Sequence, residues 1–199
     1  MNFRCGYVAL IGAPNAGKST LMNAILGLKI SIVTAKPQTT RRRVLGFHTG
    51  DDHQIIFIDT PGLIKPKYEL QESMVRAAHN AIAEADAIVF MIDAPRVLET
   101  ERTFPTGLFD MFDESGRPVI AVLNKTDLVQ DKKTLLPLMP KISEAYRFAA
   151  VIPISALKDD GIADLLDTVK PHLPVSPPLY PEDMLSDQPE RFFVSEIIR

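Results

Sequence analysis

A glycine-rich octapeptide near the N-terminus has the residue types and spacing of a phosphate-binding loop. Residues 12–19 read Gly-Ala-Pro-Asn-Ala-Gly-Lys-Ser and fit the pattern G-x-x-x-x-G-K-[ST]. Glycines permit a tight loop whose backbone N–H groups point at phosphate oxygens, and the helix that follows adds the positive end of its dipole. We expect Lys18 to contact the β- and γ-phosphates and the Ser19 hydroxyl to ligate Mg²⁺. The other nucleotide contacts expected from this loop are Asn15, Ala16, Gly17 and Thr20.

A second element, Asp59-Thr60-Pro61-Gly62, follows the loop and comes at the end of a predicted strand. The Asp59 carboxylate there can hold the water shell of Mg²⁺, and the Gly62 backbone N–H can contact a γ-phosphate. A D-x-x-G pattern is a common turn by itself. Its order after the phosphate loop is what favours a nucleotide site.

A third element, Asn124-Lys125-Thr126-Asp127, indicates which base is bound. Guanine presents an N1–H and an exocyclic amine side by side, and one carboxylate can accept from both. Adenine lacks this donor pair, so it would leave the Asp127 carboxylate unpaired and be rejected. We expect Asn124 to fix the loop and the base edge, and the Lys125 stem to cover the base. A backbone N–H from residues Ser155, Ala156 and Leu157 could reach the guanine O6.

Short apolar runs alternate with longer segments of helical character, which predicts an α/β P-loop fold with a six-stranded, mostly parallel sheet and helices on both faces. The predicted strands are Tyr7–Ile11, Arg43–Phe47, Gln54–Asp59, Ala87–Asp93, Val119–Asn124 and Val151–Ser155. The second and third are joined by turn residues and form a predicted antiparallel hairpin. The predicted helices are Lys18–Leu26, Leu70–Glu84, a segment within Thr103–Asp113, Thr134–Phe148 and Ile162–His172. Pro105, Pro137 and Pro140 leave the bounds of the third and fourth helices open.

Composition restricts the class of protein further. The chain has 199 residues and a formal net charge of −3, which argues against this stretch being a main nucleic-acid-binding unit. Cys5 is the single cysteine, so an internal disulfide and a cysteine-based metal cage are excluded, and the reducing cytosol is the simplest compartment. No apolar run reaches the roughly 20 residues that span a bilayer. The four histidines show no metal-ligand spacing.

The C-terminal part changes character after residue 173. Prolines gather between Pro171 and Pro189, and such a density is typical of an extended, semi-rigid linker. A new apolar pattern begins at Arg191 and stops at Arg199. We therefore expect a nucleotide-binding domain over residues 1–173, a linker over 174–189 and the start of a truncated domain over 190–199.

With these elements in order, the chain resembles the Era family of translation-factor-related P-loop GTPases along essentially its whole length. The resemblance is carried by residues 12–19, Lys36-Pro37-Gln38-Thr39-Thr40-Arg41, residues 59–63, Pro178-Leu179-Tyr180-Pro181-Glu182-Asp183, and Glu190 to Arg199, which looks like the start of the family's RNA-binding KH domain. It implies a GTP-switched factor in small ribosomal subunit assembly that binds 16S rRNA through the KH domain. It also implies cytoplasmic localisation with peripheral inner-membrane association, and no stable oligomer is expected.

The same resemblance implies that Thr40 closes onto Mg²⁺ and the γ-phosphate, with Thr39 as the competitor. The expected catalytic residues are then Lys18, Thr40 and Gly62, and the expected Mg²⁺ ligands are Ser19, Thr40 and Asp59. Asn15 matches the loop asparagine that coordinates an activating K⁺ in related families. Residues 41–43 are all arginine and fit RNA phosphates or a solvated charge run equally.

Ras-like enzymes carry a water-positioning glutamine directly after D-x-x-G, whereas this chain has Leu63. Leucine has no hydrogen-bonding group, so we expect slow intrinsic turnover. The first functional hypothesis is a switch whose GTP and GDP forms differ at Lys29–Arg41 and Pro61–Tyr68. The alternatives are another ribosome- or tRNA-related GTPase, an adenine-specific P-loop enzyme, and a nucleotide-binding scaffold without turnover.

Overall fold

Six strands form one sheet in the computed structural model, which describes residues 2–27, 44–60, 62, 69–100, 104 and 107–187. The strand order is β2-β3-β1-β4-β5-β6. The strands are β1 (Arg4–Gly12), β2 (Val44–Thr49), β3 (His53–Asp59), β4 (Ala87–Asp93), β5 (Val119–Asn124) and β6 (Ala150–Pro153). The β2–β3 hairpin is antiparallel, and the other neighbouring pairs are parallel. The carboxyl ends of the parallel strands therefore meet at one edge of the sheet.

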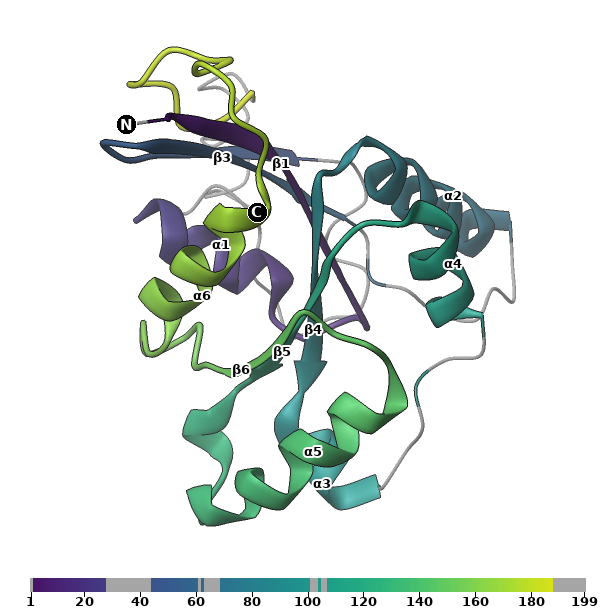
Figure 1. The fold of residues 1–199 in the computed structure, drawn as a ribbon. Coiled ribbons are helices and arrows are strands. Elements are labelled where there is room, and N and C mark those ends of the chain that lie inside the picture. The colour runs from purple at the N-terminus through teal and green to yellow at the C-terminus, as the bar shows by residue number, and fades with distance from the viewer. Residues whose placement is uncertain are drawn as a thin grey trace, which may run out of the picture.

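Helices cover both faces of this sheet (Figure 1). One face packs against α1 (Lys18–Leu26) and α6 (Ile162–Val169), and the other against α2 (Glu69–Glu84), α4 (Leu108–Ser115) and α5 (Leu135–Ala145). Strands β1, β4 and β5 are buried along almost their whole length, as expected for strands covered on both faces. The predicted six-stranded, mostly parallel α/β P-loop fold is confirmed.

The element bounds differ from the predicted ones at several points. The structure has a further helix, α3 (Ala94–Thr100), which the pattern analysis missed. The third predicted helix is α4, which begins at Leu108 and ends at Ser115 rather than Asp113. The fourth ends at Ala145, because the backbone of Tyr146 is extended.

The sixth strand and the last helix end earlier than predicted. Strand β6 stops at Pro153, and Ser155 instead forms an isolated bridge with Asp160. The last helix is α-helical only as far as Val169 and continues as a 3-10 turn over Lys170–His172. Proline at position 171 lacks a backbone N–H, so the α-helical pattern cannot continue through it.

Residues 174–187, here named the C-terminal strap, lie across the β1–β3–β2 side of the sheet (Figure 1). The Phe47 N–H of β2 donates to the Leu185 carbonyl at 3.0 Å. The Leu45 N–H donates to the Asp187 carboxylate at 3.1 Å, and the Ser186 hydroxyl donates to the Leu45 carbonyl at 2.7 Å. The outer edge of β2 is thereby paired, which removes a site for unwanted strand addition.

A buried glutamine in β3 holds the middle of the strap. The Gln54 side chain is fully buried, and its Oε1 accepts from the N–H groups of Leu179 at 2.9 Å and Tyr180 at 3.0 Å. Its Nε2 donates to the Tyr180 carbonyl at 2.9 Å and to the Thr49 hydroxyl at 3.1 Å. The Tyr180 ring lies over Phe47, with centroids 4.3 Å apart. The amide of Gln54 thus supplies hydrogen-bond partners for the backbone of Leu179 and Tyr180.

We expect Gln54→Leu to lower the free energy of unfolding by about 2–4 kcal/mol, because it leaves three partly buried backbone groups of the strap without their partner. Urea unfolding followed by circular dichroism measures this loss. The matched control is Thr49→Val, which removes one of the same bonds and should cost about 1 kcal/mol. Equal stability of Gln54→Leu and Thr49→Val would show that the strap does not depend on this amide.

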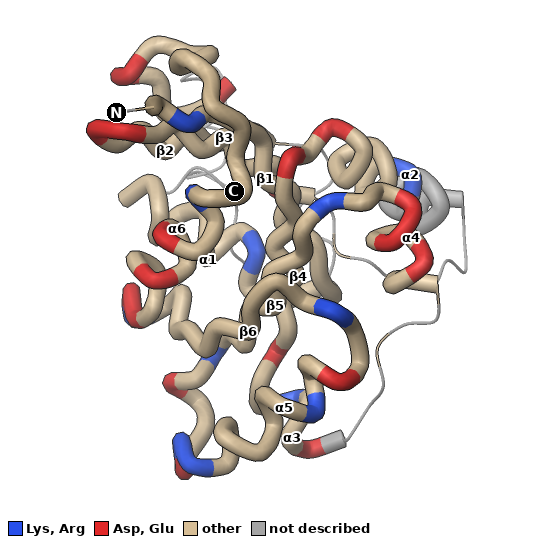
Figure 2. Tube along the Cα trace, viewed as in Figure 1, with Lys and Arg blue, Asp and Glu red and all other residues tan. Residues whose placement is uncertain are grey.

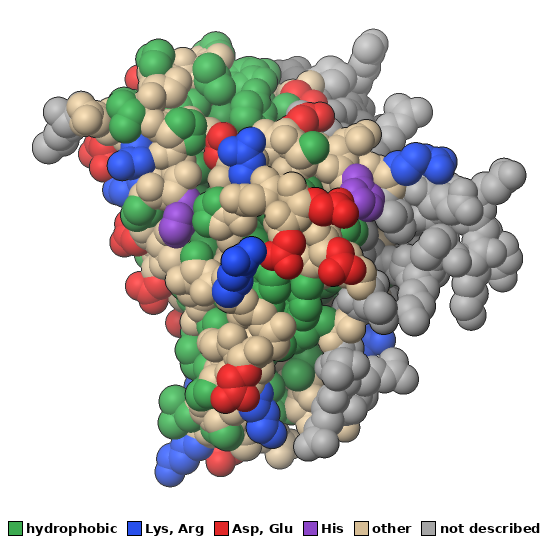
Figure 3. Space-filling model, turned by 45° about the vertical axis from the view of Figure 1, so that its right-hand side comes forward, with side chains coloured by type: hydrophobic (Ala, Val, Ile, Leu, Met, Phe, Trp, Pro, Cys, Tyr) green, Lys and Arg blue, Asp and Glu red, His purple; other side chains and the backbone are tan. Residues whose placement is uncertain are grey.

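The described surface carries charges of both signs. Figure 2 shows lysine and arginine interspersed with acidic residues along the chain. On the face in Figure 3, acidic and basic side chains again lie close together, and hydrophobic side chains gather at the top of the view. Val175 and Leu179 of the strap are 59% and 53% exposed. Because no single sign dominates, the charge distribution gives this part of the chain no clear nucleic-acid footprint.

Candidate nucleotide-binding site

The glycine-rich loop connects the end of β1 to the start of α1. Asn15 and Gly17 both have left-handed backbones, with φ of 63° and 100°. Glycine is required at position 17, because a Cβ there would collide with the side-chain amide of Asn124. The loop therefore turns tightly, and the N-terminus of α1 lies close to the carboxyl end of β1. A helix N-terminus in this position is suited to binding an anion.

The Lys18 side chain folds back onto the phosphate loop and contacts its backbone. Its residue is 6% exposed, and its Nζ donates to the carbonyls of Gly12 at 3.1 Å and Ala13 at 3.0 Å. Burial lowers the pKa of Lys18 from 10.5 to about 8, against the opposing charge of Asp59. A poorly solvated ammonium of this kind gains strongly from an incoming phosphate group.

The two expected Mg²⁺ ligands that the structure describes are in direct contact. The Ser19 hydroxyl donates to Asp59 Oδ2 at 2.7 Å. A hydroxyl and a carboxylate are hard oxygen donors, the set that Mg²⁺ prefers together with water and phosphate oxygens. The residues present therefore fit this ion, and Ser19 and Asp59 are the side chains that would hold it.

Residues 60 and 62 place the Asp59 element against β1 and the phosphate loop. The Thr60 hydroxyl donates to the Leu10 carbonyl of β1 at 2.7 Å. A Cβ added to Gly62 would come within 2.6 Å of the Pro14 backbone, so only glycine permits this approach. The backbone of Gly62 thus lies against the phosphate loop, where its expected γ-phosphate contact requires it.

Asn124 links the phosphate loop to the loop expected to read the base. Its Nδ2 donates to the Ala16 carbonyl at 2.8 Å, and its Oδ1 accepts from the Ala156 N–H at 3.0 Å. The residue is 2% exposed. Asp127 joins the same arrangement, because the Ser155 hydroxyl donates to its Oδ1 at 2.5 Å. Three segments far apart in the chain are thus held at one end of the sheet.

The N–H groups of the Ser155–Leu157 turn are used differently. Ser155 donates to the Asp160 carbonyl and Ala156 to Asn124. Leu157 makes no such bond within the described part of the chain, and it is 71% exposed. Of the three N–H groups, those of Ser155 and Ala156 thus already have partners among the described residues.

The structure brings together most of the residues that the sequence nominated. Thr20 follows Ser19 in α1, and Lys125 lies directly after β5. The nominated residues that fall outside the described ranges are Thr39, Thr40, the arginines at 41–43, Leu63, all of Lys29–Arg41, all of Pro61–Tyr68 except Gly62, and residues 190–199. One contact was not foreseen: Asp93 at the end of β4 pairs with Lys125. The sequence features that could have pointed to Asp93 are its place at the end of an apolar strand and Pro95 two positions later, because proline is common in the first turn of a helix.

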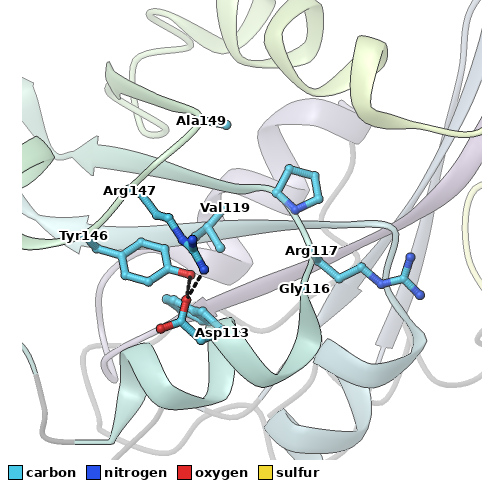
Figure 4. A pocket seen from close by; sticks show the side chains of 9 residues that line it. Asp113, Gly116, Arg117, Val119, Tyr146, Arg147 and Ala149 are labelled. Atoms are coloured by element: carbon cyan, nitrogen blue, oxygen red, sulfur yellow. Dashed lines mark hydrogen bonds and ion pairs between the residues drawn. The ribbon is translucent and has the colours of Figure 1, made fainter.

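A surface pocket of about 370 Å³ lies elsewhere, between the end of α4, the start of β5 and the segment before β6. Asp113 lines it and accepts from the Tyr146 hydroxyl at 3.0 Å and from Arg147 at 2.9 Å, the two contacts dashed in Figure 4. The pocket contains none of the residues nominated for nucleotide binding.

Among the residues that the structure describes, no three histidine, cysteine or acidic side chains gather as a metal site. No helix in the described ranges is long and apolar enough to cross a membrane.

A mostly parallel sheet with a phosphate loop after β1, an Asp-containing element after β3 and an Asn-Lys-x-Asp loop after β5 defines a P-loop domain of the guanine-nucleotide class. Comparison with known proteins gives the family. Residues 7–125 match the family described as 50S ribosome-binding GTPase. GTPase Era of Desulfovibrio desulfuricans is 43% identical over 202 aligned positions, which cover 100% of this chain and 66% of that protein. The chain belongs to this GTPase family, and within it to the Era GTPases.

Solved structures agree with this assignment. An Era variant from Aquifex aeolicus bound to GDP and aluminium fluoride superposes with a TM-score of 0.90 at 42% identity, covering 98% of this chain and 66% of that one. A structure of Era with MgGDPNP and nucleotides 1506–1542 of 16S ribosomal RNA has the same TM-score of 0.90, identity of 42% and coverage of both chains. The chain thus spans 66% of the length of these relatives.

Proposed function

We propose that this chain binds GTP and GDP and hydrolyses GTP slowly, as the nucleotide switch of an Era-type protein. The observation that carries the proposal is the pair of hydrogen bonds made by the Asn124 amide, which joins Ala16 of the phosphate loop to Ala156 of the base loop. A buried amide that joins these two loops sets the spacing between a phosphate site and a guanine site. Family membership supports the same conclusion.

In the proposed reaction the chain supplies positioning and charge. The Lys18 ammonium leaves the carbonyls of Gly12 and Ala13 and pairs with the β- and γ-phosphates. Bound Mg²⁺ would neutralise charge on the transferring group. Ser19, Asp59 and the proposed ligand Thr40 would hold the ion, and the Gly62 N–H would donate to the γ-phosphate. Because Leu63 cannot orient water, another group or a partner must do so, and intrinsic turnover is slow.

The role of the whole protein is a further part of the proposal. We propose a cytoplasmic role in small ribosomal subunit assembly, and the Era structure that contains 16S rRNA nucleotides supports that RNA as the partner. The mixed surface charge of the described part fits RNA binding by a different segment, and we propose that residues 190–199 begin that domain. Residues 1–173 then form the GTP-binding domain and residues 174–189 the connection. We also propose peripheral inner-membrane association, from family resemblance alone.

A turnover experiment tests the proposal. Phosphate release should follow first-order kinetics with GTP and Mg²⁺, should be unaffected by an excess of ATP, and should stop when EDTA is added. If Asn15 holds an activating K⁺, replacing K⁺ by Na⁺ should slow release by about tenfold, which corresponds to about 1.4 kcal/mol of barrier height. Binding of GDP without release of phosphate would support a scaffold instead, and competition by ATP would contradict guanine recognition. Equal rates in K⁺ and Na⁺ would remove only the role of K⁺.

A further inference from the structure

We propose that Asp93 is a positioning residue for guanine recognition, because it holds the Lys125 side chain in the place from which that side chain covers the base. The inference rests on the proposed binding of guanine nucleotides. It adds a residue from β4 to a base site otherwise built from the loops that follow β5 and β6.

The geometry of the pair is close and largely shielded. Lys125 Nζ lies 2.6 Å from Asp93 Oδ2, and the two side chains are 29% and 20% exposed. Asp93 pairs with Asn124 in the β4–β5 register, so its carboxylate stands beside the first residue of the base loop. A short, partly buried ion pair of this kind is stronger than an exposed one.

The Lys125 backbone has an uncommon conformation that the contact with Asp93 helps to hold. Lys125 is in the left-handed region, with φ of 68° and ψ of 36°. A long side chain is uncommon there, and such conformations persist where surrounding contacts hold them. The turn is anchored on one side by the bond from the Thr126 N–H to the Ile154 carbonyl at 3.2 Å and on the other by the pair with Asp93.

Asp93 uses its two oxygens for different purposes. While Oδ2 faces Lys125, Oδ1 accepts from the Arg96 N–H at 3.1 Å and so caps the first turn of α3. Asparagine is as good a helix N-cap as aspartate, but its NH₂ cannot accept from an ammonium. Asp93→Asn therefore removes the ion pair and keeps the cap.

The physical consequence concerns the entropy of the lysine stem. A free lysine side chain samples many rotamers, and fixing it when a ligand arrives opposes binding. The pair with Asp93 fixes the stem beforehand, and it keeps the ammonium from competing for the nucleotide phosphates. Removing the pair should therefore mainly raise the rate constant for nucleotide dissociation.

The experiment measures dissociation of fluorescently labelled GDP by stopped flow, and GDP affinity by calorimetry, in the Mg²⁺-loaded protein. Asp93→Asn should dissociate GDP 5–20 times faster and weaken its affinity by the same factor, with only a small loss of stability to urea because the helix cap is kept. Asp113→Asn is the matched control, because it removes the exposed pair with Arg147 in the pocket of Figure 4, and it should leave GDP binding unchanged.

A double-mutant cycle separates positioning from a general structural effect. In a Lys125→Met background, Asp93→Asn should have no further effect on GDP dissociation. Full additivity, or wild-type dissociation from Asp93→Asn, would overturn the inference while GDP binding by the wild type leaves the proposed function standing. Failure of the wild type to bind GDP would instead overturn the proposed function.

Discussion

Replacing Asp127 by asparagine should weaken GDP binding by roughly 10²–10⁴-fold and shift preference to xanthosine diphosphate. The wild-type carboxylate can accept from the N1–H and the exocyclic amine of guanine, and each charge-assisted bond contributes about 1.5–3 kcal/mol. The Ser155 hydroxyl donates to Oδ1, an oxygen that asparagine retains, so the loop should keep its geometry. The new NH₂ can donate to the C2 oxygen of xanthine.

Calorimetric titration of both diphosphates into both proteins measures this exchange. Asp131→Asn is a suitable control, because Asp131 accepts from the Lys133 N–H at 2.9 Å as a helix cap outside the site, and an asparagine keeps that bond. Unchanged GDP affinity in Asp127→Asn would locate base reading elsewhere. Loss of both nucleotides would indicate that the loop itself had been disturbed.

Lys18→Met should abolish most nucleotide binding and yet stabilise the nucleotide-free protein. Removing one partner of a buried charge pair costs several kcal/mol, so GDP affinity should fall roughly 10²–10³-fold. Without nucleotide, the ammonium is buried at 6% exposure and its pKa is lowered to about 8. The folded state therefore disfavours the charged form, and removing it should raise the free energy of unfolding by about 1–3 kcal/mol at pH 7.

The pH dependence of stability distinguishes this effect from a change in packing. In the unfolded chain Lys18 titrates near 10.5 and in the folded chain near 8, so between these values the unfolded state binds more protons. The free energy of unfolding of the wild type should therefore rise between pH 8 and pH 10.5, whereas that of Lys18→Met lacks this contribution. The excess stability of the variant should shrink over this range. Urea unfolding at pH 7 and at pH 10 measures both. A constant difference across this range would contradict the burial cost assigned to Lys18.

The sequence by itself determined the class of the protein and the chemistry of its loops. Glycines and a lysine at fixed spacing can make a phosphate loop because the local backbone geometry is set within eight residues. The apolar runs at β1, β4 and β5 likewise indicated strands covered on both faces, since burial of both sides leaves no polar alternation. Three of the predicted elements, over residues 18–26, 87–93 and 119–124, have the bounds found in the structure.

Only the tertiary structure decided which residues act on one another across the chain. Asn124 reaches Ala16, Gln54 holds Tyr180, and Asp93 holds Lys125. No local pattern encodes these pairs, because each joins the end or edge of one strand to a segment far away in sequence, and strand order decides which ends are neighbours. The proline-rich residues 174–187 show the same limit. Their composition indicates extended chain, but their position along β2 follows from an open sheet edge that exists only after the sheet has formed.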